Sequence, residues 1–254
     1  MIGPDDRGLT LGDGLFETLL AVDGVLQAEP AHMARLTKGC AALGLPAPDL
    51  DLARRLMAAA LADAGLTTGR AAVRLTLTAG AGGRGLDRPA LIAPRMLTAA
   101  APAPRPTTPA RLAISRVRRN EGSPTSRLKT LAYLDNVLAR REAAAAGADE
   151  AVMLNNAGHL ACAAAANLFW LRDGRLFTPA PDCGVLEGVV RAAVIAEAGR
   201  RDVEVLEVRA APEVLAQAEA VFITNSLIGV RAASSLDGLR LPTAKLVEDI
   251  AAGI

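Results

Sequence analysis

Two short runs near the N-terminus, GLFETLLA and VLQAE, alternate apolar with polar residues and are joined by Asp23-Gly24. Alternation of this kind is typical of half-buried strands, and Asp-Gly favours a two-residue turn, so a β-hairpin is predicted over 14–28. Apolar residues then recur every three or four positions, as on one face of a helix, before strand-like runs return. The expected helices cover 31–43 and 49–65, and the expected strands cover 70–79 and 91–99.

The stretch APAPRPTTP at 101–109 is rich in Pro and Thr and has no periodicity. Such a composition is typical of a linker. We therefore predict a small α+β domain at 1–103, a linker at 104–109 and a larger α+β domain at 110–254. In the larger domain we expect a strand at 110–118, a helix from about 130, strands at 150–155 and 167–178 with a turn at Asp173-Gly174, a helix from 188, and a final strand and helix.

The composition restricts the function. Apolar residues make up 51% of the 254-residue chain, and 28 basic residues face 27 acidic ones. A net charge of +1 gives no field that would gather nucleic acid or an anionic membrane, so a small-molecule partner is expected. No apolar run approaches the roughly 20 residues of a membrane helix, and MIGPDDRG lacks a signal-peptide pattern. A cytoplasmic protein is expected.

Several enzyme classes lack a basis in the sequence. The three cysteines have no CxxC spacing, and the chain contains only two histidines, His32 and His159. There is also no GxSxG segment and no cluster of His, Asp and Glu. We therefore expect no metal site, no disulfide framework and no Ser-His-Asp chemistry.

Lysine is rare in this chain: only Lys38, Lys129 and Lys245 are present. Lys38 and Lys245 fall in helical patterns and are interpreted as solvated surface residues. Lys129 follows the strand-like RLAISRVRR and a Ser/Pro/Thr loop, and it precedes the helical run TLAYLDNVLARREAAAAG. A lysine on a strand-to-helix connection is the candidate for Schiff-base chemistry.

Two segments of the second half have the donors that a phosphate needs. Gly188 opens a helix, so the backbone N–H groups of Val189 and Val190 would lie at its positive end. The run AVFITNSLIG ends an apolar strand in hydroxyl and amide groups. A simple turn glycine and a polar loop are the alternatives.

Three stretches together resemble the class IV aminotransferases, pyridoxal-phosphate enzymes of fold type IV. They are DRGLTLGDGLFETLLAVDGVLQAEPAHMARL at 6–36, LKTLAYLDNVLARREAAAAGADEAVMLN at 128–155 and GHLACAAAANLFW at 158–170. The resemblance implies an α+β chain with the two-domain D-amino acid aminotransferase-like architecture, pyridoxal 5'-phosphate as cofactor, and a homodimer.

The resemblance also implies roles for individual residues. Lys129 would be the Schiff-base lysine and the base that moves the substrate's alpha proton. Tyr133 would hydrogen-bond the cofactor phenolate. The implied phosphate ligands are Arg35, Val189, Val190, Ser226 and Leu227.

Cys162 stands where members of this family usually carry a glutamate against the pyridine nitrogen. A neutral thiol cannot give the charge-assisted hydrogen bond of a carboxylate. We therefore expect reversible transamination to be weakened more than elimination. The alternative is a relative that binds the cofactor with weak or no activity.

Within the family, RLTLTAGAGGRGL, NLFW and ITNSL resemble 4-amino-4-deoxychorismate lyases more than branched-chain aminotransferases. These lyases form 4-aminobenzoate and pyruvate in folate biosynthesis. Their substrate carries two carboxylates, for which the arginines of RVRRN, Arg118 first, are candidate ligands. The same arginines could instead line a solvated strand edge. An aminotransferase acting on D- or branched-chain amino acids is the alternative function.

Overall fold

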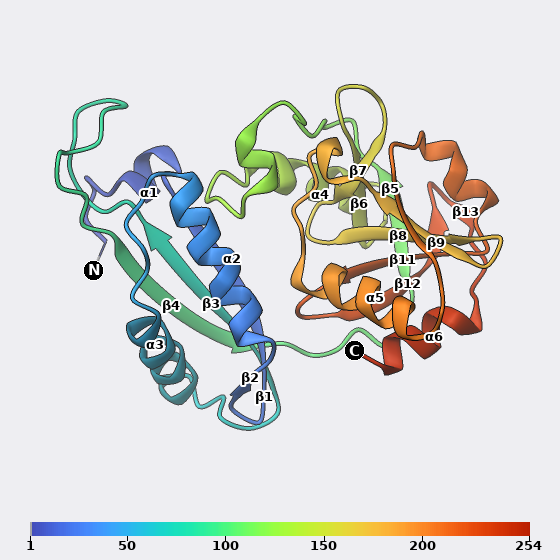
Figure 1. Ribbon diagram of the computed structural model, residues 1–254, viewed down its shortest axis with the longest axis horizontal. Coiled ribbons are helices and arrows are strands. Elements are labelled where there is room, and N and C mark those ends of the chain that lie inside the picture. The colour runs from blue at the N-terminus through green and yellow to red at the C-terminus, as the bar shows by residue number, and fades with distance from the viewer. Residues whose placement is uncertain (1) are drawn as a thin grey trace. The chain divides into compact units, whose positions relative to one another are not determined.

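The computed structural model describes residues 2–254, and their contacts divide into two units (Figure 1). The first unit comprises the chain up to Pro104 together with Leu128–Ala132. The second comprises Arg105–Arg127 and Tyr133–Ile254. The sequence places the whole of 110–254 in one domain, whereas the five residues around Lys129 make their contacts with the first unit.

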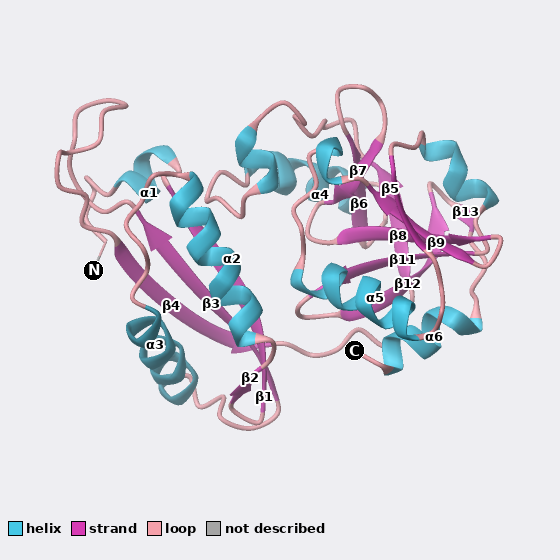
Figure 2. Cartoon of the chain, viewed as in Figure 1, coloured by secondary structure: helices cyan, strands magenta, loops and turns pink. Residues whose placement is uncertain are grey.

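A four-stranded antiparallel sheet forms the first unit, in the order β2-β1-β3-β4. Its strands are β1 (Gly14–Val22), β2 (Val25–Leu26), β3 (Arg70–Thr78) and β4 (Arg95–Pro102). The helices α2 (Glu29–Ala42) and α3 (Leu50–Asp63) lie along this sheet (Figure 2). Their apolar side chains, including Met33, Leu36 and Met57, form one core with alternate residues of β1 and β3.

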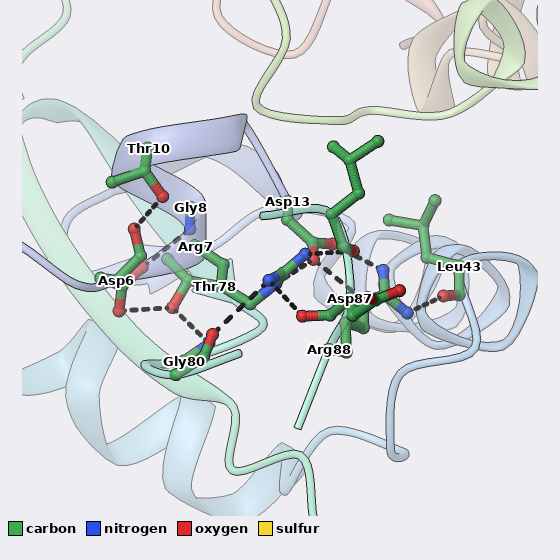
Figure 3. Close-up of polar contacts among 12 residues, drawn as sticks. Asp6, Arg7, Gly8, Thr10, Asp13, Leu43, Thr78, Gly80, Asp87 and Arg88 are labelled. Atoms are coloured by element: carbon green, nitrogen blue, oxygen red, sulfur yellow. Dashed lines mark hydrogen bonds and ion pairs between the residues drawn. The ribbon is translucent and has the colours of Figure 1, made fainter. Parts of the chain in front are cut away.

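A polar network holds the N-terminal segment on this sheet (Figure 3). Asp6 precedes the short helix α1 (Arg7–Leu11) and accepts hydrogen bonds from Gly8 N and Thr78 Oγ1 at 2.9 and 3.0 Å. The buried Arg7 donates to Asp13 and to the carbonyls of Leu86 and Asp87, each at 2.9 Å. One guanidinium therefore fixes the glycine-rich loop after β3.

The second unit is built on one mixed sheet in the order β10-β9-β8-β11-β12-β5-β6-β7, with β13 paired to β12. The pairs β5–β6, β5–β12 and β9–β10 are parallel, and the others are antiparallel. The sheet is curled, since Leu160 N–H at one end donates to Ala210 O, just beyond the strand at the other end. The strands are β5 (Ala110–Ile114), β6 (Glu150–Leu154), β7 (Leu160–Ala163), β8 (Asn167–Arg172), β9 (Arg175–Pro179), β10 (Val205–Val208), β11 (Ala220–Asn225), β12 (Gly229–Leu236) and β13 (Leu239–Arg240).

Three α-helices pack on this sheet. Helix α4 (Leu134–Ala145) buries Ala139 and Ala143 against the strand pair β6–β7. Helices α5 (Val189–Arg200) and α6 (Lys245–Ala252) lie side by side and share a core with Phe169 and Phe222 (Figure 2). Short 3-10 turns cover Pro124–Arg127, Pro181–Cys183 and Pro212–Gln217.

The structure confirms the α+β class and both predicted Asp-Gly turns. Asp23 and Gly24 have φ of 48° and 78°, and Asp173 and Gly174 have φ of 51° and 69°, as the turn between two twisted antiparallel strands requires. The predicted helix from about 130 is wrong at its start, because α4 begins at Leu134. Among residues 2–254, no helix is both long and apolar enough to cross a membrane.

Candidate functional site

Lys129 is held at the edge of the first unit by backbone hydrogen bonds on both sides. Phe16 N–H donates to Lys129 O at 2.9 Å, and Leu131 N–H donates to Gly14 O at 3.0 Å. The Lys129 ammonium lies 4.2 Å from the centroid of the Phe16 ring, a cation–π contact. Because residues 129–131 pair with β1, they cannot also form the first turn of α4.

Arg35 lies one turn after His32 on α2, and both contact Glu17 of β1. Arg35 Nε donates to Glu17 Oε1 at 2.8 Å, and His32 Nδ1 lies 2.8 Å from Glu17 Oε2. Burial raises the pKa of Glu17, but the hydrogen bonds from Arg35 and His32 outweigh it and leave the pKa below its usual value. Glu17 is therefore a buried carboxylate held in its charged form.

Sequence reasoning missed Glu17 and gave His32 no role. The signal was present in the strand pattern, since Leu15, Glu17 and Leu19 alternate and must share a face. A carboxylate on an otherwise apolar face requires a partner, and arginine is the usual one.

In the second unit, Cys162 lies on β7 opposite Met153 of β6 and is 6% exposed. Burial raises the pKa of the Cys162 thiol, and the nearby charge of Arg119 offsets this only in part. A raised pKa favours the neutral thiol over the thiolate. The tight turn Ala163–Ala166 follows it and leads into β8.

Asn167 fixes the start of α5 against β8. Its Nδ2 donates to Leu186 O at 2.8 Å, and a Cβ at Gly188 would lie only 2.1 Å from its Oδ1. Only glycine permits this approach. Helix α5 begins at Val189 without a side-chain cap, so the amides of Val189 and Val190 lie in its first turn.

The end of β11 lies beside the same turn. Thr224 pairs with Asn167 across the sheet, and Asn225 Nδ2 donates to Ala165 O at 2.9 Å. Asn225 Oδ1 accepts from Leu227 N at 2.9 Å, so the Leu227 amide already has an acceptor inside the loop that contains Ser226.

Tyr133 precedes the first turn of α4, which contacts the same region through Asn136. The Asn136 Nδ2 group donates to Ala164 O at 2.8 Å. Six predicted residues thus lie in segments that meet around the turn Ala163–Ala166 of the second unit: Tyr133, Cys162, Val189, Val190, Ser226 and Leu227. Lys129 and Arg35 belong to the first unit.

Arg118 lies in the loop after β5 with an exposed side chain. Its neighbour Arg119 instead joins three segments of the second unit, donating to Gly184 O at 3.1 Å, to Asn136 Oδ1 at 3.3 Å and to Ser126 O. Arg119 is therefore engaged in holding loops, whereas Arg118 is exposed to solvent.

The residues around α5 fit a phosphate group. Among the described residues, Thr224 Oγ1 and Arg191 Nε are buried side-chain atoms without a hydrogen-bond partner. Thr224 is at the end of β11, and Arg191 is in the first turn of α5. The Arg191 guanidinium is already paired with Glu207 through Nη2 at 2.6 Å, so the features that favour an anion are the helix N-terminus and the buried Thr224 hydroxyl.

Comparisons with known proteins identify the family of this chain. Residues 14–236 match the family described as Amino-transferase class IV. A solved 4-amino-4-deoxychorismate lyase from Pseudomonas aeruginosa is 32% identical, with 98% of this chain and 93% of that chain covered and a TM-score of 0.87. The pyridoxal-phosphate-bound form of a hypothetical aminotransferase from Mycobacterium tuberculosis is 25% identical, with 100% and 91% covered and a TM-score of 0.88.

A further relative is a probable branched-chain-amino-acid aminotransferase from Aquifex aeolicus. It is 36% identical over 134 residues, which are 52% of this chain and 43% of that protein. The match thus spans less than half the length of this relative. The family match covers most of the chain, and the solved relatives share its fold. The chain therefore belongs to the class IV aminotransferase family of pyridoxal-phosphate-dependent enzymes.

Proposed function

We propose that this chain is an aminodeoxychorismate lyase, which converts 4-amino-4-deoxychorismate to 4-aminobenzoate and pyruvate for folate biosynthesis. The observation that carries the proposal is the 32% identity to a lyase across 98% of the chain. A solved fold IV-transaminase from Curtobacterium pusillum aligns over 99% of the chain at a lower identity, 29%.

The residues of the chain have distinct proposed roles. Lys129 Nζ would bind the cofactor covalently until the substrate amine displaces it, and the released amine would then accept the proton from the substrate carbon that bears the amine. Arg35 and the amides of Val189 and Val190 would hold the phosphate, together with Ser226. The Leu227 amide would contribute by sharing its hydrogen between the phosphate and Asn225 Oδ1, to which it donates at 2.9 Å. Tyr133 would donate a hydrogen bond to the cofactor phenolate, and Arg118 would bind a substrate carboxylate.

Cys162 supports the lyase reaction by its chemistry. The bound cofactor supplies an electron sink for the carbon next to the amine. If Cys162 faces the ring nitrogen, as the resemblance implies, its neutral thiol would stabilise the negative charge on the bound ring less than a carboxylate, which keeps that nitrogen protonated. In the proposed reaction the charge departs with the leaving pyruvate, so the weaker support limits elimination less than transamination.

A branched-chain aminotransferase is the second candidate, because the relative with 36% identity has that function in its name. It differs from the lyase in what becomes of the amine. A transaminase transfers the amine to a 2-oxo acid, whereas the lyase retains it in 4-aminobenzoate.

Incubation of the cofactor-loaded protein with 4-amino-4-deoxychorismate tests the proposal, with 4-aminobenzoate and pyruvate measured in the same samples. Lys129→Ala removes the proposed catalytic amine. Lys245→Ala is the matched control, because Lys245 is an exposed lysine of α6 paired with Asp249 at 2.8 Å.

The expected result is equal release of both products by the wild type and by Lys245→Ala, and none by Lys129→Ala. Amine transfer from a branched-chain or D-amino acid to 2-oxoglutarate without release of pyruvate would contradict the lyase and favour the second candidate. Cofactor binding with neither reaction would favour a relative with weak or no activity.

A homodimer and a cytoplasmic location stay predictions from the sequence. Light scattering on the eluting protein would test the dimer, with twice the 26.1 kDa chain mass as the expected result.

A further inference from the structure

The sheet of the first unit buries a carboxylate on its apolar face. Glu17 lies between Leu15 and Leu19 on β1, and its side chain is only 1% exposed. Burying a charge is costly unless it is paired and hydrogen-bonded. Both partners, His32 and Arg35, come from successive turns of α2.

The contact with Arg35 is bidentate. Glu17 Oε1 accepts from Arg35 Nε at 2.8 Å, and Glu17 Oε2 accepts from Arg35 Nη2 at 2.5 Å. Two parallel hydrogen bonds fix the plane of a guanidinium as well as its position. The two bonds use Nε and Nη2 of Arg35.

Exposure differs sharply within this group. The side chains of Glu17 and His32 are each 1% exposed, whereas that of Arg35 is 18% exposed. His32 Nδ1 lies 2.8 Å from Glu17 Oε2, the oxygen that also faces Arg35 Nη2. The carboxylate is therefore anchored from inside the core, and the guanidinium reaches outward from it.

We propose that Glu17, itself held by His32, is a positioning residue that orients the Arg35 guanidinium toward the cofactor phosphate. This inference rests on the phosphate-binding role proposed above for Arg35. Glu17 acts through Arg35 and does not touch the cofactor.

Glu17 has two effects on an anion, and they oppose each other. Its negative charge weakens the attraction between Arg35 and a phosphate, whereas its two hydrogen bonds hold the guanidinium in one orientation. Glu17→Gln removes the charge and places an amide donor against Arg35 or His32. Positioning therefore predicts weaker phosphate binding in this variant, and a purely electrostatic role predicts tighter binding.

The experiment titrates the cofactor-free protein with pyridoxal phosphate and, separately, with pyridoxal, which lacks the phosphate. Binding is followed by the absorbance change of the added compound. The variants are Glu17→Gln, Arg35→Ala and the double substitution. Glu197→Gln is the matched control, because Glu197 is another buried carboxylate that accepts from two arginines, Arg200 and Arg201, at the far end of α5.

For Glu17→Gln we expect the Kd of pyridoxal phosphate to rise about tenfold or more, as for loss of a charge-assisted hydrogen bond, and the Kd of pyridoxal to stay unchanged. In the Arg35→Ala background, Glu17→Gln should have no further effect. Glu197→Gln should bind both compounds like the wild type.

Three results would overturn the inference. Unchanged or tighter binding of pyridoxal phosphate by Glu17→Gln would exclude positioning while leaving the role of Arg35 intact. An equal loss for both compounds would mean that Glu17 only supports the fold. If Arg35→Ala did not alter the preference for the phosphorylated compound, the role of Arg35 itself would fail. Should Glu17→Gln not fold, Glu17→Asp, which keeps the charge but shortens the reach, is expected to give the same selective loss.

Discussion

Replacement of Gly188 by alanine should damage the start of α5. The new Cβ would lie 2.1 Å from Asn167 Oδ1, whereas ordinary contact begins at 3.4 Å. The backbone itself would accept alanine, because φ and ψ at Gly188 are −72° and 145°. The effect therefore comes from the steric clash alone, and either Asn167 or the helix start must move.

The free energy of unfolding should fall by about 2 kcal/mol. Overpacking of this kind costs about 1–3 kcal/mol, and displacing Asn167 also breaks its 2.8 Å hydrogen bond to Leu186 O. The affinity for pyridoxal phosphate should fall about tenfold, because the amides of Val189 and Val190 would move with the helix start.

Urea unfolding of the cofactor-free protein measures the first effect, and titration with the cofactor measures the second. Gly199→Ala is the matched control, because it lies in the same helix and its Cβ would meet nothing within 4 Å. Gly199 lies in the last turn of α5, so alanine there should leave the stability unchanged or raise it by less than the roughly 1 kcal/mol expected in a helix interior. Similar stability and affinity in Gly188→Ala and wild type would refute the reasoning.

Two further predictions concern charge. Cys162→Glu should increase the rate of transamination about tenfold over the wild type, because a carboxylate can keep the pyridine nitrogen protonated. Cys162→Gln is the uncharged control. No gain in the glutamate variant would contradict the proposed role of the thiol. Asp149 should stabilise the fold above about pH 4 and lose this effect as the pH falls toward 2, because hydrogen bonds from Arg111 lower its pKa from 3.8 to about 2. Asp149→Asn should therefore unfold with less dependence on pH over that range, and an unchanged acid profile would show that the pair is irrelevant to stability.

Local chemistry made much of the fold predictable. The turns at Asp23-Gly24 and Asp173-Gly174 depend only on two adjacent residues, because Asp and Gly tolerate positive φ. The helices α2 and α3 followed from apolar spacing and differ from their predicted limits by one or two residues. Strand β7 was not predicted, because the run LACA is short and too uniformly apolar to show alternation.

For the candidate site, too, the sequence identified residues by local pattern but not the contacts they make with distant segments. Lys129 was singled out by the sequence because it lies between a strand-like segment and a helix, and lysines are scarce in this chain. That residues 129–131 pair with β1 instead of starting a helix depends on Gly14 and Phe16, more than a hundred positions away. No local pattern contains that information.

The sequence by itself determined the family, the order of most elements and the identity of the candidate lysine, because these depend on residue types and short spacings. Only the tertiary structure decided that Asn167 meets Gly188, that Asn136 meets Ala164 and that Glu17 holds Arg35. Each of these contacts joins separate elements, and its energy depends on burial, which is settled only when the elements pack.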